Sequence, residues 1–291
     1  SGAVGALLVD SLVAAGGATL HVVDRRSPAS RSGVTPIHDD ICRPSDSTLR
    51  LIETTELVIL ATPEHVAIEG VRAFLPRMKQ GSLLVDTLSV KSRFAKALAT
   101  VHRRAEVLGI NPMFAPSLGF AGRSVVAVPY AAGDLAEAFL DFICSEGASV
   151  MRLNAEEHDR ACAALQVATH AAVLSFGVAL RAAGYDLAAA EKIAPPPHRT
   201  MLALLARILS ADPEVYRDIQ AANPFAAEMR AQLAAALRHL DAAVGSDDAE
   251  PFHRLIGELR SLFDDTSTNY AALCARLFDV DPIAPRDRSE S

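Results

Sequence analysis

Residues 57–63 have the sequence LVILATP, in which five apolar residues are followed by a threonine and a proline. A short apolar run rich in branched side chains is typical of a strand buried on both faces, and proline ends such a strand. Similar runs lie at residues 82–85, 107–110 and 125–128, and helical patterns at residues 66–75 and 135–144 alternate with them. This alternation predicts an α/β fold with a doubly wound, mostly parallel sheet.

Polar residues follow the ends of several of these runs. In a sheet of parallel strands, ligands bind beyond the carboxyl ends of the strands. The polar residues at these positions are Asp24, Thr62, Asp86 with Ser89, and Asn111, and Pro63 and Thr87 lie beside two of them. We therefore expect them to line one rim of the sheet, although they lie far apart in the sequence.

The first residues of the chain predict a nucleotide-binding turn. The segment formed by Gly2, Ala3, Val4 and Gly5 matches the last part of a G-x-G-x-x-G fingerprint. In that fingerprint the glycines let the backbone approach a pyrophosphate at the start of a helix. We expect the first glycine and the strand before it to lie upstream of Ser1. The predicted domain is therefore Rossmann-like.

Asp24 bears on the choice between the two nicotinamide dinucleotides. It ends the apolar run at residues 18–23. An acidic residue at the end of this strand, about 20 residues after the glycines, binds the ribose hydroxyls of NAD. Arg25 and Arg26 follow it and could instead hold the 2′-phosphate of NADP. NAD is therefore the expected cofactor, with NADP as the alternative.

The second half of the chain has no strand pattern from Ala155 onward. An Ala-rich segment up to Gly184 predicts one long helix, and residues 223–244 and 251–278 predict further helices. We place the domain boundary near Leu153. Residues 1–153 then form the nucleotide-binding domain, and residues 154–291 form an all-helical domain for substrate binding and dimerisation.

The stretch at residues 161–180 carries no charge and approaches the length of a membrane span. Its polar residues Gln166, Thr169, His170 and Ser175, and its many alanines, favour a buried helix of a helical domain over a membrane span. One small domain cannot easily bury so much apolar surface, so we expect a homodimer through the helical domain.

The composition narrows the class of protein. Half of the 291 residues are hydrophobic and 22% are charged, as in a globular protein with a sizeable core. A net charge of −7 argues against nucleic-acid binding, which needs a basic surface. The four cysteines are scattered with no C-x-x-C pair, which argues against a disulfide framework or a metal site. With no signal-peptide pattern, we expect a cytoplasmic protein.

Five phrases occur in a fixed order along the chain. They are LVDTLSVK at residues 84–91, LGINPMFAP at residues 108–116, Glu157-His158-Asp159, Gln166 with His170, and Pro197-His198-Arg199. Together they resemble the prephenate/arogenate dehydrogenase family, especially the dehydrogenase part of bifunctional chorismate mutase–prephenate dehydrogenases. The resemblance implies that a hydride passes from C4 of a cyclohexadiene to NAD(P), while the ring carboxylate leaves as CO2 and the ring becomes aromatic.

The resemblance also implies roles for individual residues. Ser89 and Lys91 would lie beside the nicotinamide and the substrate, with Lys91 as one cation for a dianionic small molecule. A solvated lysine at a helix start is the alternative for Lys91. Arg199 matches the family arginine that grips a substrate carboxylate, aided by the free N–H groups of a helix start. A surface salt bridge is the alternative for Arg199.

Gln166 and His170 lie four residues apart and so share one face of a helix. On an apolar helix such a pair faces partners or a cavity, and a satisfied core pair is the alternative. His158 and Asp159 are expected to cap and orient this helix rather than to do chemistry. His65, on the predicted rim, is expected either to touch the cofactor or to serve the structure.

Two positions depart from the family pattern. The family has His where this chain has Asn111, and that His accepts a hydrogen bond from the 4-hydroxyl of the substrate and helps to remove its proton. An asparagine cannot take a proton, although its carbonyl oxygen can accept a hydrogen bond. Losing a positioned base typically costs about 10²–10⁴ in rate. Ala115 also stands where the family usually has Gly.

A substrate with nitrogen at C4 suits Asn111 better, because the lone pair of a neutral amine can drive hydride loss without a base. The resembled family includes 4-amino-4-deoxyprephenate dehydrogenases, and this reaction is our leading hypothesis. The alternatives are a prephenate or arogenate dehydrogenase that works with Asn111, and a catalytically silent relative that senses a tyrosine-like ligand.

Overall fold

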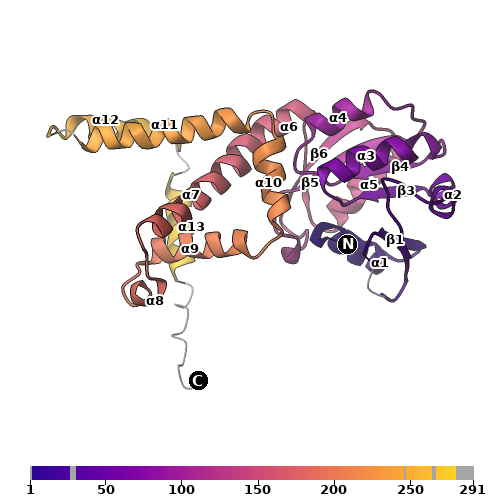
Figure 1. The fold of residues 1–291 in the computed structure, drawn as a ribbon, viewed down its shortest axis with the longest axis horizontal. Coiled ribbons are helices and arrows are strands. Elements are labelled where there is room, and N and C mark those ends of the chain that lie inside the picture. Colours follow the sequence, from indigo (N-terminus) through magenta and orange to yellow (C-terminus); the bar gives the residue numbers. More distant parts are fainter. Residues whose placement is uncertain (1, 27–30, 246, 264–266, 280–291) are drawn as a thin grey trace, which may run out of the picture. The chain divides into compact units, whose positions relative to one another are not determined.

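The computed structural model describes residues 2–26, 31–245, 247–263 and 267–279. The chain divides into two compact units. Unit 1 consists of Ser1–Val167 and Glu214–Ala227, and unit 2 consists of Ala168–Pro213 and Glu228–Ser291. Figure 1 labels the helices and strands of both units.

Unit 1 holds all the strands that the structure describes. The strands are β1 (Leu20–Asp24), β2 (Val34–His38), β3 (Leu57–Leu60), β4 (Leu83–Asp86), β5 (Glu106–Pro112), β6 (Ser124–Ala131) and β7 (Ser149–Arg152). The helices of unit 1 are α1 (Ala3–Ala15), α2 (Asp46–Thr54), α3 (Glu64–Phe74), α4 (Ser92–Leu98), α5 (Asp134–Ser145), α6 (Ala155–Cys162) and α10 (Pro213–Ala222). The strands end at Arg152, in agreement with the predicted change to a helical chain.

The strands form two sheets. β1 pairs with β2, and the larger sheet has the order β3-β4-β5-β6-β7. Every pairing is parallel except that of β5 with β6, which is antiparallel. The predicted α/β fold with a mostly parallel sheet is confirmed, although within the described residues no strand joins β1 to β3. β6 runs antiparallel because the link before it, residues 113–123, contains only a short 3-10 helix, Pro116–Leu118, and no crossover helix.

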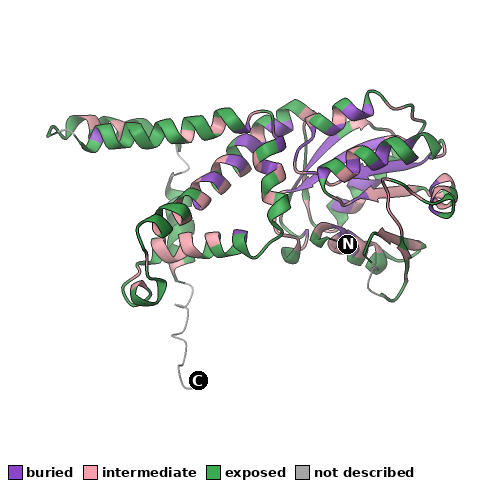
Figure 2. Cartoon of the chain, in the orientation of Figure 1, coloured by how far each residue is buried: buried purple, intermediate pink, exposed green. Residues whose placement is uncertain are grey.

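Helices cover both faces of the larger sheet and bury its central strands β4 and β5 (Figure 2). One core packs α3 and α4, through residues such as Phe74 and Phe94, against Leu84 of β4. The other core packs α1 and α5, through residues such as Leu8, against Leu83 and Val85 of the same strand. Successive side chains of a strand point to opposite faces, so an uninterrupted apolar strand supplies both cores.

The carboxyl ends of the strands meet at one edge of the larger sheet. Leu60 pairs with Asp86, and Asp86 pairs with Gly109. Asn111, which we placed just after its strand, instead lies within β5 and pairs with Val126 of β6. The strand is longer than predicted because the antiparallel pairing with β6 continues beyond the end of β4.

The predicted long helix is present, from Ala155 to Ala182. Its middle, Ala163–Ala168, is π-helical and joins α6 to α7 (Thr169–Ala182). A π-helical turn contains one extra residue, which rotates the following side chains relative to those before it. The sequence pattern did not predict this irregularity.

Unit 2 is entirely helical among its described residues. Besides α7 its helices are α8 (Leu187–Ala190), α9 (Pro196–Leu209), α11 (Ala226–Val244), α12 (Glu250–Arg260) and α13 (Ser267–Phe278). α7 can pack closely on α9 because Gly177 has no side chain. A Cβ at that position would lie 2.7 Å from the side chain of Leu205. The hydroxyl of Tyr185 lies 2.6 Å from Nε2 of His198 at the start of α9. Much of α11 and α12 is exposed (Figure 2).

Candidate active site

The loop after β4 forms a buried ion pair. The Asp86 carboxylate accepts hydrogen bonds from the backbone N–H of Leu88 at 3.0 Å and from the Lys91 amine at 2.5 Å. The Lys91 amine also donates to the carbonyl oxygen of Ile110 at 2.9 Å. Both charged side chains have no exposed surface. The loop is therefore tied to both β4 and β5.

Gly109 makes room for this ion pair. A Cβ at that position would lie 2.8 Å from Oδ2 of Asp86, 3.0 Å from the Tyr130 ring and 3.1 Å from the Lys91 amine. Gly109 was not among the predicted site residues. A glycine in the middle of a buried strand is a signal of close approach, and it could have identified this position from the sequence.

Lys91 is therefore not the solvated lysine of the alternative interpretation. Burial lowers the pKa of its amine, while the charge and hydrogen bond of Asp86 act in the opposite direction. Because the Lys91 amine is already bound to Asp86 and to the Ile110 carbonyl, it is placed to hold the loop between β4 and α4 rather than to meet a substrate dianion directly. Ser89, which lies in this loop, is half-buried.

Asn111 is linked to two buried residues of α6. Its side-chain amide nitrogen lies 3.0 Å from Nε2 of His158. Nδ1 of His158 lies 2.8 Å from a carboxylate oxygen of Asp159. Asn111 is 2% exposed, and His158 and Asp159 have no exposed surface. A continuous series of hydrogen bonds thus runs from β5 to α6.

Asp159 also binds the start of α4. Its two carboxylate oxygens accept from the backbone N–H groups of Lys91 and Ser92, each at 2.8 Å. Although burial raises the pKa of Asp159, these hydrogen bonds and the one from His158 lower it below its usual value. The expectation that His158 and Asp159 cap their own helix is wrong, because α6 is capped by Asn154 with a capping box. The pair instead joins α6 to α4 and β5.

Cys162 completes this cluster without being a nucleophile. Its sulfur lies 3.5 Å from Nε2 of His158 and 3.7 Å from the Asn111 amide nitrogen. A Cys-His-Asp arrangement resembles that of thiol hydrolases. Burial, and then the charge of Asp159, raise the pKa of the thiol to about 12. The thiol therefore stays protonated and unreactive at neutral pH.

The start of α1 fits a dinucleotide phosphate. Within the described ranges no side chain caps its first turn, which leaves backbone N–H groups for an anion. A Cβ at Gly2 would meet no described atom within 4 Å. Ala3 and Val4 belong to the first turn, and Gly5 is buried.

Asp24 lies at the carboxyl end of β1, the first strand after α1. It is the last residue of β1, and its carboxylate accepts from the backbone N–H of Arg26 at 2.8 Å. Arg25 is exposed, and its carbonyl oxygen lies 2.7 Å from Nε2 of His38. These residues fit a dinucleotide with a ribose hydroxyl on Asp24.

Several side chains of the rim near the start of α3 are buried or bound to other residues of the protein. Among the described residues the buried hydroxyl of Thr62 has no hydrogen-bond partner, and Thr87 donates to the carbonyl oxygen of Leu60 at 3.2 Å. Pro63 precedes the first turn of α3. Glu64 of that turn is buried and pairs with Arg93 at 2.7 Å, and burial raises its pKa. His65 is exposed.

The remaining predicted residues lie in the helical part. Gln166 lies in the π-helical segment, and its buried side-chain oxygen has no partner within the described ranges. His170 is half-buried in α7, where burial lowers its pKa. Arg199 in α9 donates to the carbonyl oxygen of Glu191 at 3.0 Å and makes no salt bridge with any residue the structure describes. His170 and Arg199 belong to unit 2, whereas Asp86, Lys91 and Asn111 come together in unit 1.

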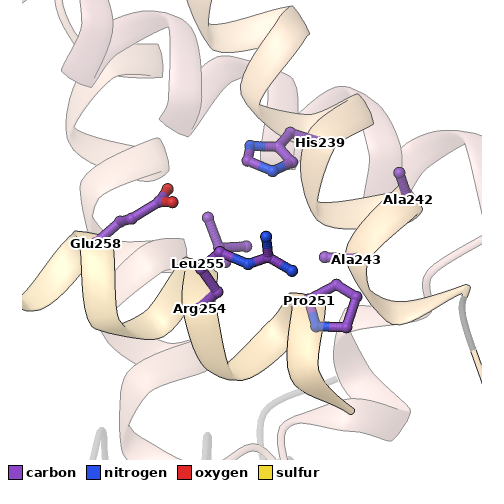
Figure 3. Close-up of a pocket in the computed structure, with 7 residues that line it drawn as sticks. All are labelled: His239, Ala242, Ala243, Pro251, Arg254, Leu255 and Glu258. Atoms are coloured by element: carbon purple, nitrogen blue, oxygen red, sulfur yellow. The ribbon is translucent and has the colours of Figure 1, made fainter. Parts of the chain in front are cut away.

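A pocket lies between α11 and α12 in unit 2 and contains none of the predicted site residues (Figure 3). It is lined by His239, Ala242, Ala243, Pro251, Arg254, Leu255 and Glu258. Over the part of the chain that the structure describes, no group of three or more His, Cys, Asp or Glu side chains could hold a metal ion.

Comparisons with known proteins give two family matches, which together cover most of the chain. Residues 20–127 match the family model of the prephenate dehydrogenase nucleotide-binding domain, and residues 154–258 match that of the prephenate dehydrogenase dimerization domain. The chain is 42% identical, over 96% of its length and 94% of the relative's, to a 4-amino-4-deoxyprephenate dehydrogenase of Streptomyces pristinaespiralis. It is 29% identical, over 75% of its length and 50% of the relative's, to a probable arogenate/prephenate dehydrogenase of Methanocaldococcus jannaschii.

Solved structures share the fold. A prephenate dehydrogenase from Aquifex aeolicus, in complex with hydroxyphenyl propionate and NAD+, aligns with a TM-score of 0.60 at 16% identity, over 89% of this chain and 92% of that one. A putative prephenate dehydrogenase from Corynebacterium glutamicum aligns with a TM-score of 0.65 at 17% identity, over 94% of this chain and 93% of that one.

Proposed function

The chain belongs to the prephenate dehydrogenase family and is an NAD(P)-dependent oxidoreductase of that type, and we propose that its substrate is 4-amino-4-deoxyprephenate. The observation that carries this proposal is Asn111, a buried amide that cannot take a proton. The similarity to the Streptomyces pristinaespiralis enzyme supports it. Membership of a family of enzymes also argues against the silent ligand sensor considered from the sequence.

The reaction balances without an enzyme base. The hydride leaves C4 with its electron pair, and the nitrogen lone pair forms a C=N bond. The ring carboxylate then leaves as CO2, and the electrons of the broken bond pass through the ring back to nitrogen. The product is 4-aminophenylpyruvate, an aromatic amine. A bound nicotinamide dinucleotide supplies the oxidant that accepts the hydride.

Asn111 contributes a hydrogen-bond acceptor to this reaction. The substrate amine must be unprotonated when hydride leaves, because only then is its lone pair available. An amide oxygen that accepts from an N–H of the amine leaves the lone pair free. A prephenate hydroxyl would gain more from a proton acceptor at this position than from an amide.

NAD is the proposed cofactor. The carboxylate of Asp24 would accept hydrogen bonds from ribose hydroxyls and would repel a 2′-phosphate. The start of α1 would hold the pyrophosphate, with Thr62, Pro63 and Thr87 along the rim. Arg25 is exposed, so NADP remains the alternative if this side chain approaches the ribose.

The dianionic substrate needs cations and polar partners. We assign Arg199 to one substrate carboxylate, because no acidic side chain that the structure describes neutralises it. We assign Gln166 and His170 to the same site, since both place polar atoms on an otherwise apolar helix. Ser89 would lie beside the nicotinamide, whereas Asp86 and Lys91 hold the loop that carries Ser89.

A homodimer through the helical domain is proposed from the dimerization-domain match. One helix among the described residues, Ala155–Ala182, is long and apolar enough to cross a membrane by length and composition alone. It lies within the matched dimerization domain, so we assign its apolar surface to packing in that domain and between subunits. The free cysteines fit a reducing cytoplasm.

The proposed function is tested by assaying NADH formation with both substrates. We expect a higher kcat/KM for 4-amino-4-deoxyprephenate than for prephenate. Asn111→His should raise kcat/KM for prephenate, by part of the roughly 10²–10⁴ that a general base provides, and should not help the amine. A wild-type enzyme that prefers prephenate, with a ratio unchanged in Asn111→His, would identify a prephenate dehydrogenase that works with Asn111.

A further inference from the structure

The series of hydrogen bonds that runs from Asp159 through His158 to Asn111 has only one possible donor-to-acceptor direction. An ionised carboxylate can only accept, and Asp159 accepts from Lys91, Ser92 and Nδ1 of His158. The proton of His158 therefore sits on Nδ1. Burial lowers the pKa of His158, which keeps the imidazole neutral, so Nε2 carries a lone pair.

This direction fixes which end of the Asn111 side-chain amide faces His158. Only its NH2 group can donate to the lone pair on Nε2 of His158, over 3.0 Å. The carbonyl oxygen of the amide must then face the other way. Among the residues the structure describes, no protein group donates to that oxygen. That oxygen is therefore available to accept a hydrogen bond from a bound molecule.

We propose that His158, held by Asp159, is a positioning residue that makes Asn111 present its carbonyl oxygen, and not its NH2 group, to the C4 substituent of the substrate. This inference rests on the proposed function for the identity of that substituent. An acceptor polarises an N–H bond of the amine and leaves the nitrogen lone pair free to drive hydride loss. A rotated amide would donate to the same lone pair and oppose the reaction.

The first experiment uses the wild-type protein. Nitrogen-15 NMR of the histidine side chains, with His158 assigned from the spectrum of His158→Phe, gives the tautomer at neutral pH. We expect a neutral imidazole with the proton on Nδ1 and a bare Nε2. A proton on Nε2 would require Asn111 to turn its carbonyl oxygen toward His158, and the proposal would be wrong.

The second experiment is a double-mutant cycle. His158→Phe removes the acceptor for the amide, and Asn111→Leu removes the amide at similar volume. In the wild-type background we expect His158→Phe to lower kcat on the aminated substrate about tenfold, the value of one hydrogen bond, with little change in KM. In the Asn111→Leu background the same change should have no further effect on kcat.

Two further variants separate positioning from packing. His158→Gln keeps an acceptor near the position of Nε2 and should recover part of the lost kcat. Cys144→Ala, at an exposed position of α5 outside this cluster, is the control, and the ratio of kcat/KM for the two substrates should stay at the wild-type value. NADH binding measured by fluorescence checks that each variant is folded.

The outcomes distinguish this inference from the proposed function. Equal losses from His158→Phe in both backgrounds, or no difference between His158→Phe and His158→Gln, would mean that His158 serves only the fold. A wild-type preference for prephenate would overturn the substrate assignment alone. The tautomer and the coupling between His158 and Asn111 can be measured whichever substrate is preferred.

Discussion

The side chains of the candidate site differ in whether their charge changes with pH. His158 has no exposed surface, and burial holds its pKa below the ordinary value although Asp159 accepts from it. Asn111 does not titrate at all. The only group at the reacting carbon that changes charge is then the amine of the proposed substrate.

The buried imidazole makes stability depend on pH. In the unfolded chain His158 takes up a proton as pH falls through about 6.5, but in the folded chain it stays neutral to lower pH. The free energy of unfolding should therefore be level above that pH and fall below it, by up to about 1.4 kcal/mol per pH unit from this residue. Urea unfolding between pH 5 and 8 measures the slope.

His158→Phe should flatten that slope. A slope that is the same in the wild type and in His158→Phe would show that the imidazole is already protonated in the folded protein.

Arg199 is expected to bind a carboxylate. Its guanidinium donates to one backbone carbonyl and keeps further donors. Charged hydrogen bonds contribute about 1.5–3 kcal/mol, so Arg199→Ala should raise KM roughly 10- to 100-fold with a smaller change in kcat. Arg181→Ala, at an exposed position in the last turn of α7, is the matched control and should change neither constant. A fall in kcat at unchanged KM would give Arg199 a different role.

At the scale of elements, β4 and β5 determine whether the ion pair of Asp86 and Lys91 can form. Gly109→Ala would place a methyl group 2.8 Å from Asp86 and 3.1 Å from the Lys91 amine. We expect a loss of about 1–3 kcal/mol in unfolding free energy, as for other overpacked cores, and a fall in activity. Thermal or urea unfolding measures the loss of unfolding free energy.

The matched control is Gly257→Ala in α12, where an added Cβ meets nothing within 4 Å. It should stabilise the protein by up to about 1 kcal/mol through helix propensity. If both substitutions had the same effect, the strands would have room that the structure does not show.

The strands were predictable within one or two residues at most ends because burial on both faces leaves an uninterrupted apolar run. The extension of β5 through Asn111 was not predictable, because it depends on pairing with β6, whose direction no residue of β5 encodes. The burial of Lys91 was missed for a similar reason. Its partner Asp86 is only five residues away, but the space for both depends on the register of Gly109 against Asp86.

At the scale of the whole molecule, the sequence was sufficient to predict an α/β unit followed by helices. It did not predict that α6 and α10 pack with the strand-containing unit. The series of hydrogen bonds explains α6, because His158 and Asp159 bind residues of β5 and α4. For α10, the loop residue Asn223 donates to the carbonyl oxygen of Asp159 at 2.7 Å.

The dimer is tested on the whole chain. Light scattering at micromolar concentration should give about twice the chain mass of 30.8 kDa. Val178→Glu puts a charge at a 70% exposed position of α7 and should shift the mass toward that of the monomer. Leu118→Glu, at a 55% exposed position of unit 1, is the control and should leave the dimer intact. A wild-type monomer would contradict the proposal.

The contact between Asp159 and α4 also has a consequence for the order of folding. α4 has no side-chain cap of its own, and the carboxylate that serves its first turn lies 67 residues further along the chain than Ser92. Closing so long a loop costs entropy before it yields any contact. The cap on the first turn of α4 can therefore form only after α6 has been synthesised and has docked. Because α6 follows β7 in the chain, we expect the nucleotide-binding unit to be completed only after its last strand has left the ribosome.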